Sequence, residues 1–395
     1  VQHRVCRTQG ADELARLQSI RTRGFPCALC VLGGERFMKA DLKGMSLAET
    51  EAWVEAQGLP AYRAKQVRQW LFKGLVASFK DMTNIAKGLR AQLEETARIT
   101  HLVQEKTQVS KDRTTKFLFK LDDGHFIETV LIPERGHFTL CISSQAGCAM
   151  GCRFCLTARQ GLKRSLTAAE IVDQVIHVKR SMSEPDRLTN IVFMGMGEPL
   201  ANYDAVVRAL GNLISEEGMN FSHRTVTLST CGLVPKIRRL GREARVNLAV
   251  SLNASDDDTR SFLMPVNRKY PLKSLIEALR EFPTLNRRMI TFEYVLVGGV
   301  NDREEDAQRL AALLKGVRAT INLIALNPHP DLELASSSPE RVLRFQEILI
   351  EHHFTTMIRK SKGQDISAAC GQLSGKHARC ESPVAGCQMQ AAGRK

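Results

Sequence analysis

The chain has 395 residues, which exceeds one average domain but also fits a single α/β barrel with a small appendage. Lys and Arg number 56 against 42 Asp and Glu, and the net charge of +14 favours nucleic acid as a partner over a merely soluble basic protein. No apolar run is long enough to span a membrane, and 11 Cys without a regular disulfide framework indicate a reducing compartment, which excludes a small secreted scaffold.

The N-terminal segment 1–37 is Arg-rich and poorly periodic, so we expect a poorly ordered extension, with the working protein beginning near Met38. An apolar stretch at 24–34 imitates a signal peptide. It contains a proline and lacks a clear small-residue cleavage site, so we expect a cytoplasmic protein that is not exported. Cys27 and Cys30 form a C-x-x-C motif without the partner pair or βαβ context that metal or redox use needs.

The segment 38–105 is predicted to form a small basic helical domain. A capping box begins at Ser46, with Glu49 at the third helical position. Apolar residues recur at helical spacing: Val67, Trp70, Leu71 and Leu75. Basic residues crowd the same stretch: Arg63, Lys65, Arg68 and Lys73. This pattern fits docking on an RNA backbone, and equally a solvated charged face.

A β-hairpin is predicted in a linker at 106–135, with strands at 114–121 and 125–132 around the turn Asp122-Asp123-Gly124. From 136 to 376, strand-like runs and amphipathic helices alternate, which predicts an α/β fold with a parallel sheet and functional residues at the carboxyl ends of its strands. The strand-like runs are 189–194, 224–229, 246–252, 289–296, 319–325 and 355–358. We expect the tail at 377–395 to be disordered.

Three thiols stand close together at Cys148, Cys152 and Cys155. Three thiolates can hold three corners of an iron-sulfur cube and leave the fourth iron open. Zinc is the main alternative, but structural zinc normally takes four protein ligands, and no second Cys pair lies nearby. A packing role alone is the other alternative, although the polar and Gly-rich neighbours make a poor core strand.

The spacing C-x-x-x-C-x-x-C, with Phe154 before the last Cys, resembles the radical S-adenosylmethionine (SAM) enzymes. The resemblance implies a partial (β/α)6 barrel and a [4Fe-4S] cluster on Cys148, Cys152 and Cys155. It also implies SAM bound at the open iron, where a reduced cluster can inject one electron and cleave a C–S bond.

The segment with Gly197 and Glu198 ends a strand and looks like this family's G-E-P motif, whose carboxylate takes the SAM ammonium. Other positions at successive strand ends complete the expected SAM site: the polar residues Ser229, Ser251, Asn253 and Asn327, with Leu252 in the middle of the triplet 251–253. A single Ser or Asn there is usually a turn cap, but the recurrence favours binding. Asn253 stands where the family often has His.

A narrower resemblance covers roughly 38–379 and points to the bacterial dual-specificity RNA adenosine C2-methyltransferases. Four segments carry it: 127–130, 141–145, 359–363 and 365–373. It implies that the substrates are an adenosine in large-subunit (23S) ribosomal RNA and the adenosine next to the anticodon of tRNA. A one-electron donor such as flavodoxin or ferredoxin and a monomeric state are also expected.

The same resemblance implies a sequence of roles for three residues and the use of two SAM per turnover. Cys370 takes a methyl group from the first SAM. The second SAM yields a 5′-deoxyadenosyl radical, which takes a hydrogen from that methyl group, and the carbon radical adds to C2. Glu128 is the candidate base for the C2 proton, and Cys141 releases the RNA by attacking the thioether, which leaves a disulfide with Cys370.

Cys370 must act as a thiolate, and nearby basic residues are expected to lower its pKa: Arg359, Lys360 and Lys362. Without the resemblance, Cys141 would be read as a buried strand thiol and Glu128 as a solvent-facing carboxylate. Cys231 is left as structural.

Three rival functions stay open at this point. The first is the related C8-methylating resistance enzyme, which shares the cysteines. The second is a cluster-bearing RNA-binding protein without catalysis. The third is another radical SAM reaction, which would leave Cys141, Glu128 and Cys370 without a joint purpose.

Overall fold

The computed structural model describes residues 39–284 and 288–375. The expectations for the extension before Met38, for Cys27 and Cys30, and for the tail at 377–395 lie outside these residues. Within the described ranges, no helix is long and apolar enough to cross a membrane.

The helical segment near the start of the described chain forms three α-helices. The elements are β1 (Ala40–Asp41), the 3-10 helix η1 (Leu42–Gly44), α2 (Leu47–Ala56), α3 (Tyr62–Phe72), η2 (Phe79–Asp81), α4 (Lys87–Thr96) and β2 (Ala97–Arg98). The predicted capping box is confirmed, since Glu49 N donates to Ser46 Oγ and Ser46 N donates to Glu49 Oε2. Val67 and Leu71 are buried on the apolar face of α3, as their spacing predicts.

Arg68 is not part of a solvated or RNA-facing surface, and that expectation is wrong for this residue. Its side chain is buried, and its guanidinium donates to the Met45 carbonyl and to Asn212 Oδ1. Burial lowers the pKa of Arg68 to about 10. Lys65 and Lys73 remain exposed, so the basic face of this segment is smaller than its composition indicates.

A ten-stranded sheet forms the centre of the molecule, in the order β14-β13-β12-β11-β10-β9-β6-β5-β4-β3. Its antiparallel part comprises β3 (Val103–Val109), β4 (Thr115–Lys120), β5 (Phe126–Glu134) and β6 (His137–Cys141). The predicted hairpin is therefore present as β4 and β5, with Gly124 at a φ of 85° in its turn. Because β5 pairs with β6, the hairpin extends the main sheet instead of standing apart as a linker.

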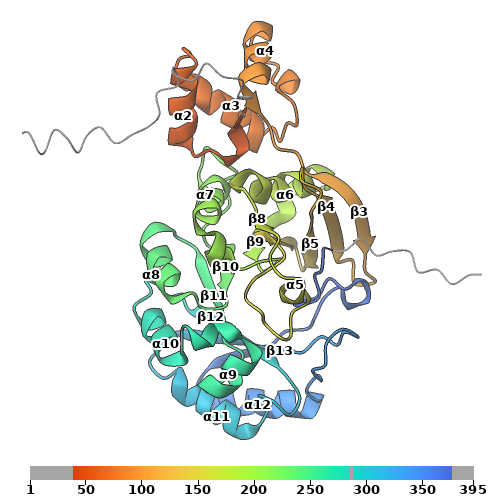
Figure 1. The fold of residues 1–395 in the computed structure, drawn as a ribbon, viewed down its shortest axis with the longest axis vertical. Helices are drawn as coiled ribbons and strands as arrows, with labels where there is room; N and C mark the ends of the chain where they lie inside the picture. The colour runs from red at the N-terminus through yellow and green to blue at the C-terminus, as the bar shows by residue number, and fades with distance from the viewer. Residues whose placement is uncertain (1–38, 285–287, 376–395) are drawn as a thin grey trace, which may run out of the picture. The chain divides into compact units, whose positions relative to one another are not determined.

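The parallel part of the sheet confirms the predicted α/β class and the partial barrel. It runs through β6 and then β9 (Leu188–Phe193), β10 (Val226–Thr230), β11 (Asn247–Ser251), β12 (Ile290–Leu296), β13 (Ala319–Ala325) and β14 (Thr355–Ile358). Figure 1 shows helices packed along these strands: α6 (Ala168–Ser181), α7 (Tyr203–Ile214), α8 (Val234–Glu243), α9 (Asp257–Leu263), α10 (Leu272–Arg280), α11 (Glu304–Leu313) and α12 (Pro339–Glu351).

Strand β12 shows how the sequence divides its side chains between the two faces of the barrel wall. Its buried positions alternate with half-buried ones: Ile290, Phe292, Tyr294 and Leu296 are fully covered. The intervening Thr291, Glu293 and Val295 border internal cavities. Successive side chains of a strand point to opposite faces, so one set packs into the core and the other faces the barrel interior.

Candidate active site

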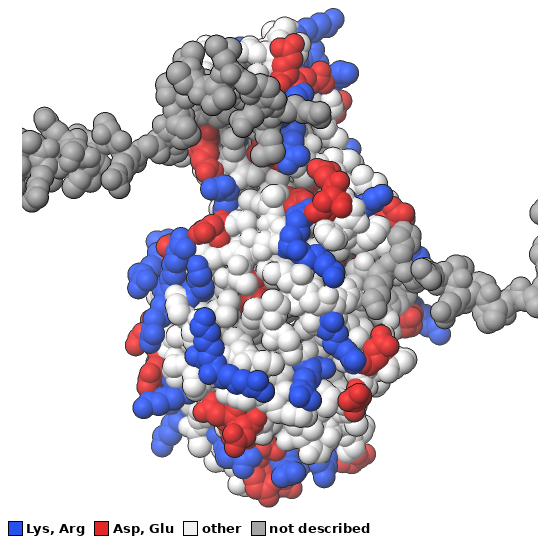
Figure 2. Space-filling view, in the orientation of Figure 1, with Lys and Arg blue, Asp and Glu red and all other residues white. Residues whose placement is uncertain are grey.

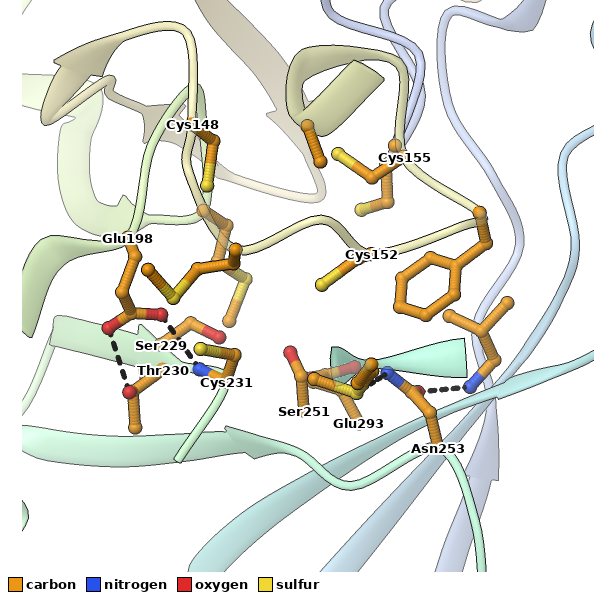
Figure 3. Close-up of a pocket in the computed structure, with 18 of the residues that line it drawn as sticks. Cys148, Cys152, Cys155, Glu198, Ser229, Thr230, Cys231, Ser251, Asn253 and Glu293 are labelled. Carbon is orange, nitrogen blue, oxygen red and sulfur yellow. Dashed lines mark hydrogen bonds between the residues drawn. The ribbon is translucent and has the colours of Figure 1, made fainter. Parts of the chain in front are cut away.

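The loop with the three clustered thiols lies between β7 (Gln145–Ala146) and α5 (Leu156–Arg159). Cys148, Cys152 and Cys155 all border a cavity of about 170 Å³ at the carboxyl ends of the barrel strands. Figure 3 shows the three thiols grouped along this loop above the strand-end residues. The loop brings them to one cavity, as their spacing predicts.

The chemistry of these thiols fits an iron-sulfur cluster. Burial raises the pKa of all three, that of Cys148 to about 12, so the thiolates need a strongly positive partner. Within the described ranges, no three His, Cys, Asp or Glu side chains converge as ligands of one metal ion. Zinc needs such convergence, whereas a four-iron cube takes thiolates spread around its corners.

Glu198 follows β9 and is fixed against the same cavity. Its carboxylate accepts hydrogen bonds from the Thr230 hydroxyl and the Cys231 N–H, both at 2.8 Å (Figure 3). Burial raises its pKa, and these hydrogen bonds oppose the shift. Gly197 has a φ of 98°, and a Cβ there would lie 2.5 Å from Gln145 Cβ, so this position requires glycine. Glu198 is thus held as a buried, hydrogen-bonded carboxylate in the cavity wall, an environment that suits a cationic group.

Three of the predicted SAM ligands lie at the ends of neighbouring strands. Ser229 and Ser251 border the cavity from β10 and β11. Asn253 also borders it, with a φ of 57°, but its Oδ1 accepts the Val295 N–H at 2.8 Å and its Nδ2 contacts Met264 Sδ at 3.2 Å. Both polar atoms of the Asn253 side chain therefore contact protein, and this residue fixes the cavity wall next to Val295.

Leu252 differs from the other predicted SAM ligands, because its side chain is fully buried and does not border the cavity. Alternate residues of an extended chain point to opposite faces, which turns Leu252 into the core. Its carbonyl accepts from Arg260 Nε at 3.0 Å, and Arg260 also donates to the Cys231 carbonyl at 2.7 Å. The buried guanidinium thus joins the ends of β10 and β11, a role that the sequence did not reveal.

Cys370 lies between this cavity and a second one of about 420 Å³, and it borders both. It belongs to a segment that we call the Cys370 loop, residues 363–375. Asn327, a predicted SAM ligand, borders the first cavity and donates to the Cys370 carbonyl at 3.1 Å. Asn327 therefore positions the Cys370 loop in addition to lining the cavity.

The pKa of Cys370 shifts in the direction opposite to the one expected. Burial raises it to about 11, and the negative charge of Glu293 adds to this shift. Arg359 lowers the pKa, as expected, but its effect is smaller than that of burial. Cys370 is an exposed residue, but it lies where protein walls surround the two cavities, and this enclosure outweighs the basic neighbours.

Cys141 ends β6 and borders the second cavity together with Cys370. Burial and the negative charge of the Cys370 thiolate raise the pKa of Cys141. Both are free thiols in this structure. The fold therefore brings the predicted disulfide partners to one cavity.

Glu128 borders neither cavity. Its carboxylate is buried, pairs with Lys116 Nζ at 2.9 Å, and accepts from the N–H groups of Ser374 and Gly375 at 2.6 and 2.9 Å. Lys116 also donates to the Ser367 carbonyl at 3.2 Å. The Glu128–Lys116 pair thus holds both ends of the Cys370 loop.

Sequence reasoning missed several residues that shape the two cavities. Thr230 and Cys231 hold Glu198, and Glu293 borders both cavities from the middle of β12. A lone carboxylate within the apolar run 290–296 is the signal that would have identified Glu293. Lys116 gives no such signal, since one of many lysines in an alternating strand is ordinarily exposed.

Basic side chains gather at the surface over α8 in the view of Figure 2. This helix carries Lys236, Arg238, Arg239 and Arg242. Arg238 pairs with Glu281 and Arg239 with Glu243, so part of this charge is compensated locally. Exposed pairs of this kind are screened by solvent and leave a net basic surface that suits a polyanion.

Residues 142–311 match the Radical SAM superfamily, and residues 40–99 match the Ribosomal RNA large subunit methyltransferase N-terminal domain. The chain is 52% identical to the Dual-specificity RNA methyltransferase RlmN of Geobacter sulfurreducens over 350 residues, which are 89% of this chain and 96% of that protein. It is 49% identical to the protein of the same name from Syntrophus aciditrophicus, over 86% of this chain and 97% of that protein.

A solved structure described as a radical SAM methyltransferase from Sphaerobacter thermophilus is similar throughout. The TM-score is 0.81 at 47% sequence identity, and the match covers 85% of this chain and 100% of that chain.

Proposed function

The chain belongs to the RlmN family of radical SAM methyltransferases, and from this premise we propose that it methylates C2 of adenosine in 23S ribosomal RNA and in tRNA next to the anticodon. The dual specificity named for its relatives supports two RNA substrates. The observation that carries the proposal is the placement of Cys370 between two cavities. A group at this position can take a methyl from one side and deliver it to the other.

The first cavity is the proposed site for the family's two cofactors, with Cys148, Cys152 and Cys155 as cluster ligands. When bound there, a [4Fe-4S] cluster supplies the electron that cleaves SAM. Glu198 receives the SAM ammonium, because it is the acidic residue of the segment that resembles G-E-P and its buried carboxylate is oriented by Thr230. The remaining wall at Ser229, Ser251, Asn253 and Asn327 positions SAM next to Cys370.

Cys370 takes the first methyl group by nucleophilic displacement. Its thiol loses a proton, the S–CH3 bond forms, and the sulfonium–CH3 bond of SAM breaks to give the neutral thioether S-adenosylhomocysteine. Because burial raises the pKa of the Cys370 thiol to about 11, the thiol must lose its proton before it can attack. Two SAM molecules are used for each methyl delivered, the second as the radical source.

Glu128 and Cys141 complete the proposed reaction at C2. Glu128 is the proposed base for the C2 proton by resemblance. It borders neither cavity, so it reaches the base only if the Cys370 loop moves, and its hydrogen bonds to Ser374 and Gly375 couple it to that loop. Cys141 then attacks the sulfur of Cys370, so that an S–S bond forms as the S–CH2 bond to the base breaks, and the released carbon takes a proton to complete the methyl group. A disulfide between the two cysteines forms as the RNA is released, and an external reductant restores the thiols.

The setting of the enzyme is part of the same proposal. We assign 38–105 to an accessory domain, 106–135 to the hairpin and 136–376 to the catalytic barrel. The protein acts as a cytoplasmic monomer, and a flavodoxin- or ferredoxin-type donor reduces its cluster. A reducing compartment fits the use of free thiols at Cys141 and Cys370.

The test is anaerobic reconstitution with isotopically labelled SAM, followed by mass spectrometry of nucleosides from the RNA. The proposal expects label in C2-methyladenosine and none after Cys370→Ala, while the iron content of the variant stays unchanged. Label in C8-methyladenosine would establish the rival methylation. RNA binding that is indifferent to Cys370→Ala, with no label transferred by either protein, would establish a binder without catalysis.

A further inference from the structure

The second cavity has the form of a ligand site that opens onto Cys370. It lies in the barrel interior, on the side of Cys370 away from the cluster loop. Its volume of about 420 Å³ is within the range of small-molecule sites. Four residues border both this cavity and the first one: Met194, Glu293, Ile324 and Cys370. A molecule in the second cavity therefore meets the sulfur of Cys370 directly.

Several side chains with hydrogen-bond acceptors line this cavity, Glu134 and three threonines among them, and two of them, Glu293 and Asn322, form a hydrogen-bonded pair in its wall. Glu293 and Asn322 are register partners on β12 and β13, and Asn322 Nδ2 donates to Glu293 Oε1 at 2.9 Å. Asn322 is 8% exposed, and its Oδ1 is buried without a hydrogen-bond partner in the part of the chain that the structure describes. A buried acceptor without a donor costs about 1–3 kcal/mol, and a ligand donor would remove that cost.

Glu293 has acceptor capacity beyond its bond to Asn322, because a carboxyl group has several lone pairs. Burial raises the pKa of Glu293, and the Asn322 amide and Arg359 oppose the shift. The carboxyl group of Glu293 and the amide group of Asn322 are thus neighbours in the cavity lining, and a small rotation of the Asn322 side chain would bring its oxygen to a ligand. This pair suits a group with two N–H bonds, such as an aromatic amine.

The rest of the cavity suits a nucleotide. Apolar side chains from three strands line part of it: Ile132, Val192 and Ile358. Basic side chains line another part: Arg359, Lys360 and Lys362. A base can lie against the apolar side while a phosphate meets the basic residues, as in enzymes that take a base out of its stack.

We propose that Glu293 and Asn322 recognise the exocyclic amine of the target adenine in the second cavity. The inference rests on the proposed function and adds the residues that select the base. The amine of adenine donates two N–H bonds, whereas guanine carries an acceptor oxygen at the same position and would face the two acceptors. C2 and the carbon that bears the amine both flank N1 of adenine, and Cys370, Glu293 and Asn322 line the same cavity, so one bound base can present its amine to the acceptors and C2 to Cys370.

The test compares two RNAs that differ only in this amine. One has adenosine at the target position, and the other has purine riboside, which keeps C2–H and lacks the amine. Protein with methylated Cys370 is prepared, the methylated fraction is measured by mass spectrometry, and methyl transfer to each RNA is followed in single turnovers. The unchanged protein should transfer to adenosine about 10- to 100-fold faster than to purine riboside.

The protein side of the test uses Asn322→Leu, with Thr320→Val on the same strand as the matched control. Asn322→Leu should reduce transfer to adenosine and have little effect on purine riboside, so that the two RNAs react at similar rates. Thr320→Val should keep the full discrimination. Glu293→Gln serves as a second variant, with reduced discrimination expected.

Each outcome decides the inference. Equal rates on both RNAs with the unchanged protein overturn it and leave the proposed function standing, and this result requires no folded variant. Full discrimination retained by Asn322→Leu also overturns it. No methylation of either RNA by the unchanged protein removes the proposed function and this inference with it.

Discussion

The wall of the first cavity and the Cys370 loop are built in different ways. The wall comes from the ends of neighbouring parallel strands, so that Glu198 meets Thr230 only 32 residues later. The Cys370 loop is held by distant segments. Ser374 bonds to Glu128 across 246 residues, and the Leu373 carbonyl accepts from Thr157 across 216. The sheet preorganises cofactor binding, whereas placement of Cys370 depends on the hairpin and α5, so each can be damaged separately.

Gly197→Ala should have the largest effect on SAM affinity, because it distorts the backbone that holds Glu198 in the wall of the first cavity. The added Cβ would clash with Gln145, and the φ of 98° is strained for alanine. We expect SAM affinity of the reconstituted protein to fall by more than about 100-fold and stability by roughly 3 kcal/mol, measured by calorimetry and denaturant unfolding.

Gly211→Ala is the matched control for this change. Gly211 lies in α7, and a Cβ there would meet open space. Its stability should stay the same or rise by up to about 1 kcal/mol, with SAM affinity unchanged. If Gly197→Ala bound SAM as tightly as the unchanged protein, SAM binding would not depend on the geometry of this wall.

Lys116→Met should damage the Cys370 loop and spare the wall. It removes the cation from the buried Glu128 carboxylate and the donor to the Ser367 carbonyl. We expect methylation of Cys370 by SAM to slow about 10- to 100-fold, with SAM affinity changed by less than about twofold, since the loss corresponds to roughly 1–3 kcal/mol of loop positioning. Mass spectrometry of the Cys370 peptide follows the reaction.

Lys120→Met is the control for Lys116→Met, because Lys120 is exposed on the same strand. It should change neither methylation nor SAM affinity. If Lys116→Met weakened SAM binding as much as methylation, the two regions would not be separable.

The methylation of Cys370 and the binding of SAM to the first cavity should depend on pH in different ranges, one above and one below neutral pH. The pKa of Cys370 is raised to about 11, so the thiolate fraction and the rate of Cys370 methylation should rise about tenfold per unit from pH 7 to 10. SAM binding should weaken only on acidification, as Glu198 protonates at a raised pKa. Mass spectrometry of the Cys370 peptide from pH 7 to 10 and calorimetry of SAM binding from neutral pH downward check the two responses.

Two variants test whether the charges of Glu293 and Arg359 contribute to the pKa of Cys370. Glu293→Gln removes a negative charge that raises the Cys370 pKa, so its profile should shift to lower pH, and Arg359→Met should shift it to higher pH. A rate plateau below pH 9 in the unchanged protein would contradict the raised pKa.

The smallest effect is expected from a change remote from both regions. Lys65→Ala with Lys73→Ala removes two exposed charges from the helical segment. RNA affinity should fall a few-fold and the log–log salt slope by about 2, with SAM binding and Cys370 methylation unchanged. The matched control is a single change at the exposed Lys315, and equal RNA affinity in all these proteins would show that the helical segment makes no phosphate contacts there.

The strand ends were predictable from the sequence because parallel strands bring their carboxyl ends together whatever lies between them. Glu198, Ser229 and Ser251 follow from that rule. Glu293 carries one signal, as a lone carboxylate in an apolar run, but its pairing with Asn322 was not predictable, because both lie in the middle of strands and become neighbours of a site only when the sheet curves into a barrel. The barrel interior is the part of the site that a linear pattern does not reveal.

Charged residues were the other source of error. Arg68 was expected on an RNA-docking or solvated face, and Lys116 was not singled out, but each is buried against a partner far along the chain, Asn212 and the Ser367 carbonyl respectively. Propensity and periodicity carry no information on such long-range pairs. Glu128 was selected by resemblance alone, and its role stays a prediction.

The contacts of the helical segment set an order for its folding during synthesis. Lys43 forms a buried ion pair with Asp173 at 2.5 Å, and Arg68 bonds to Asn212, partners that are translated 130 and 144 residues later. When the helical segment leaves the ribosome, Lys43 and Arg68 do not yet have these partners, and burying either side chain without its partner would be unfavourable. The helical segment can complete its packing only after α6 and α7 have emerged. An early part of the chain is therefore among the last to reach its final packing.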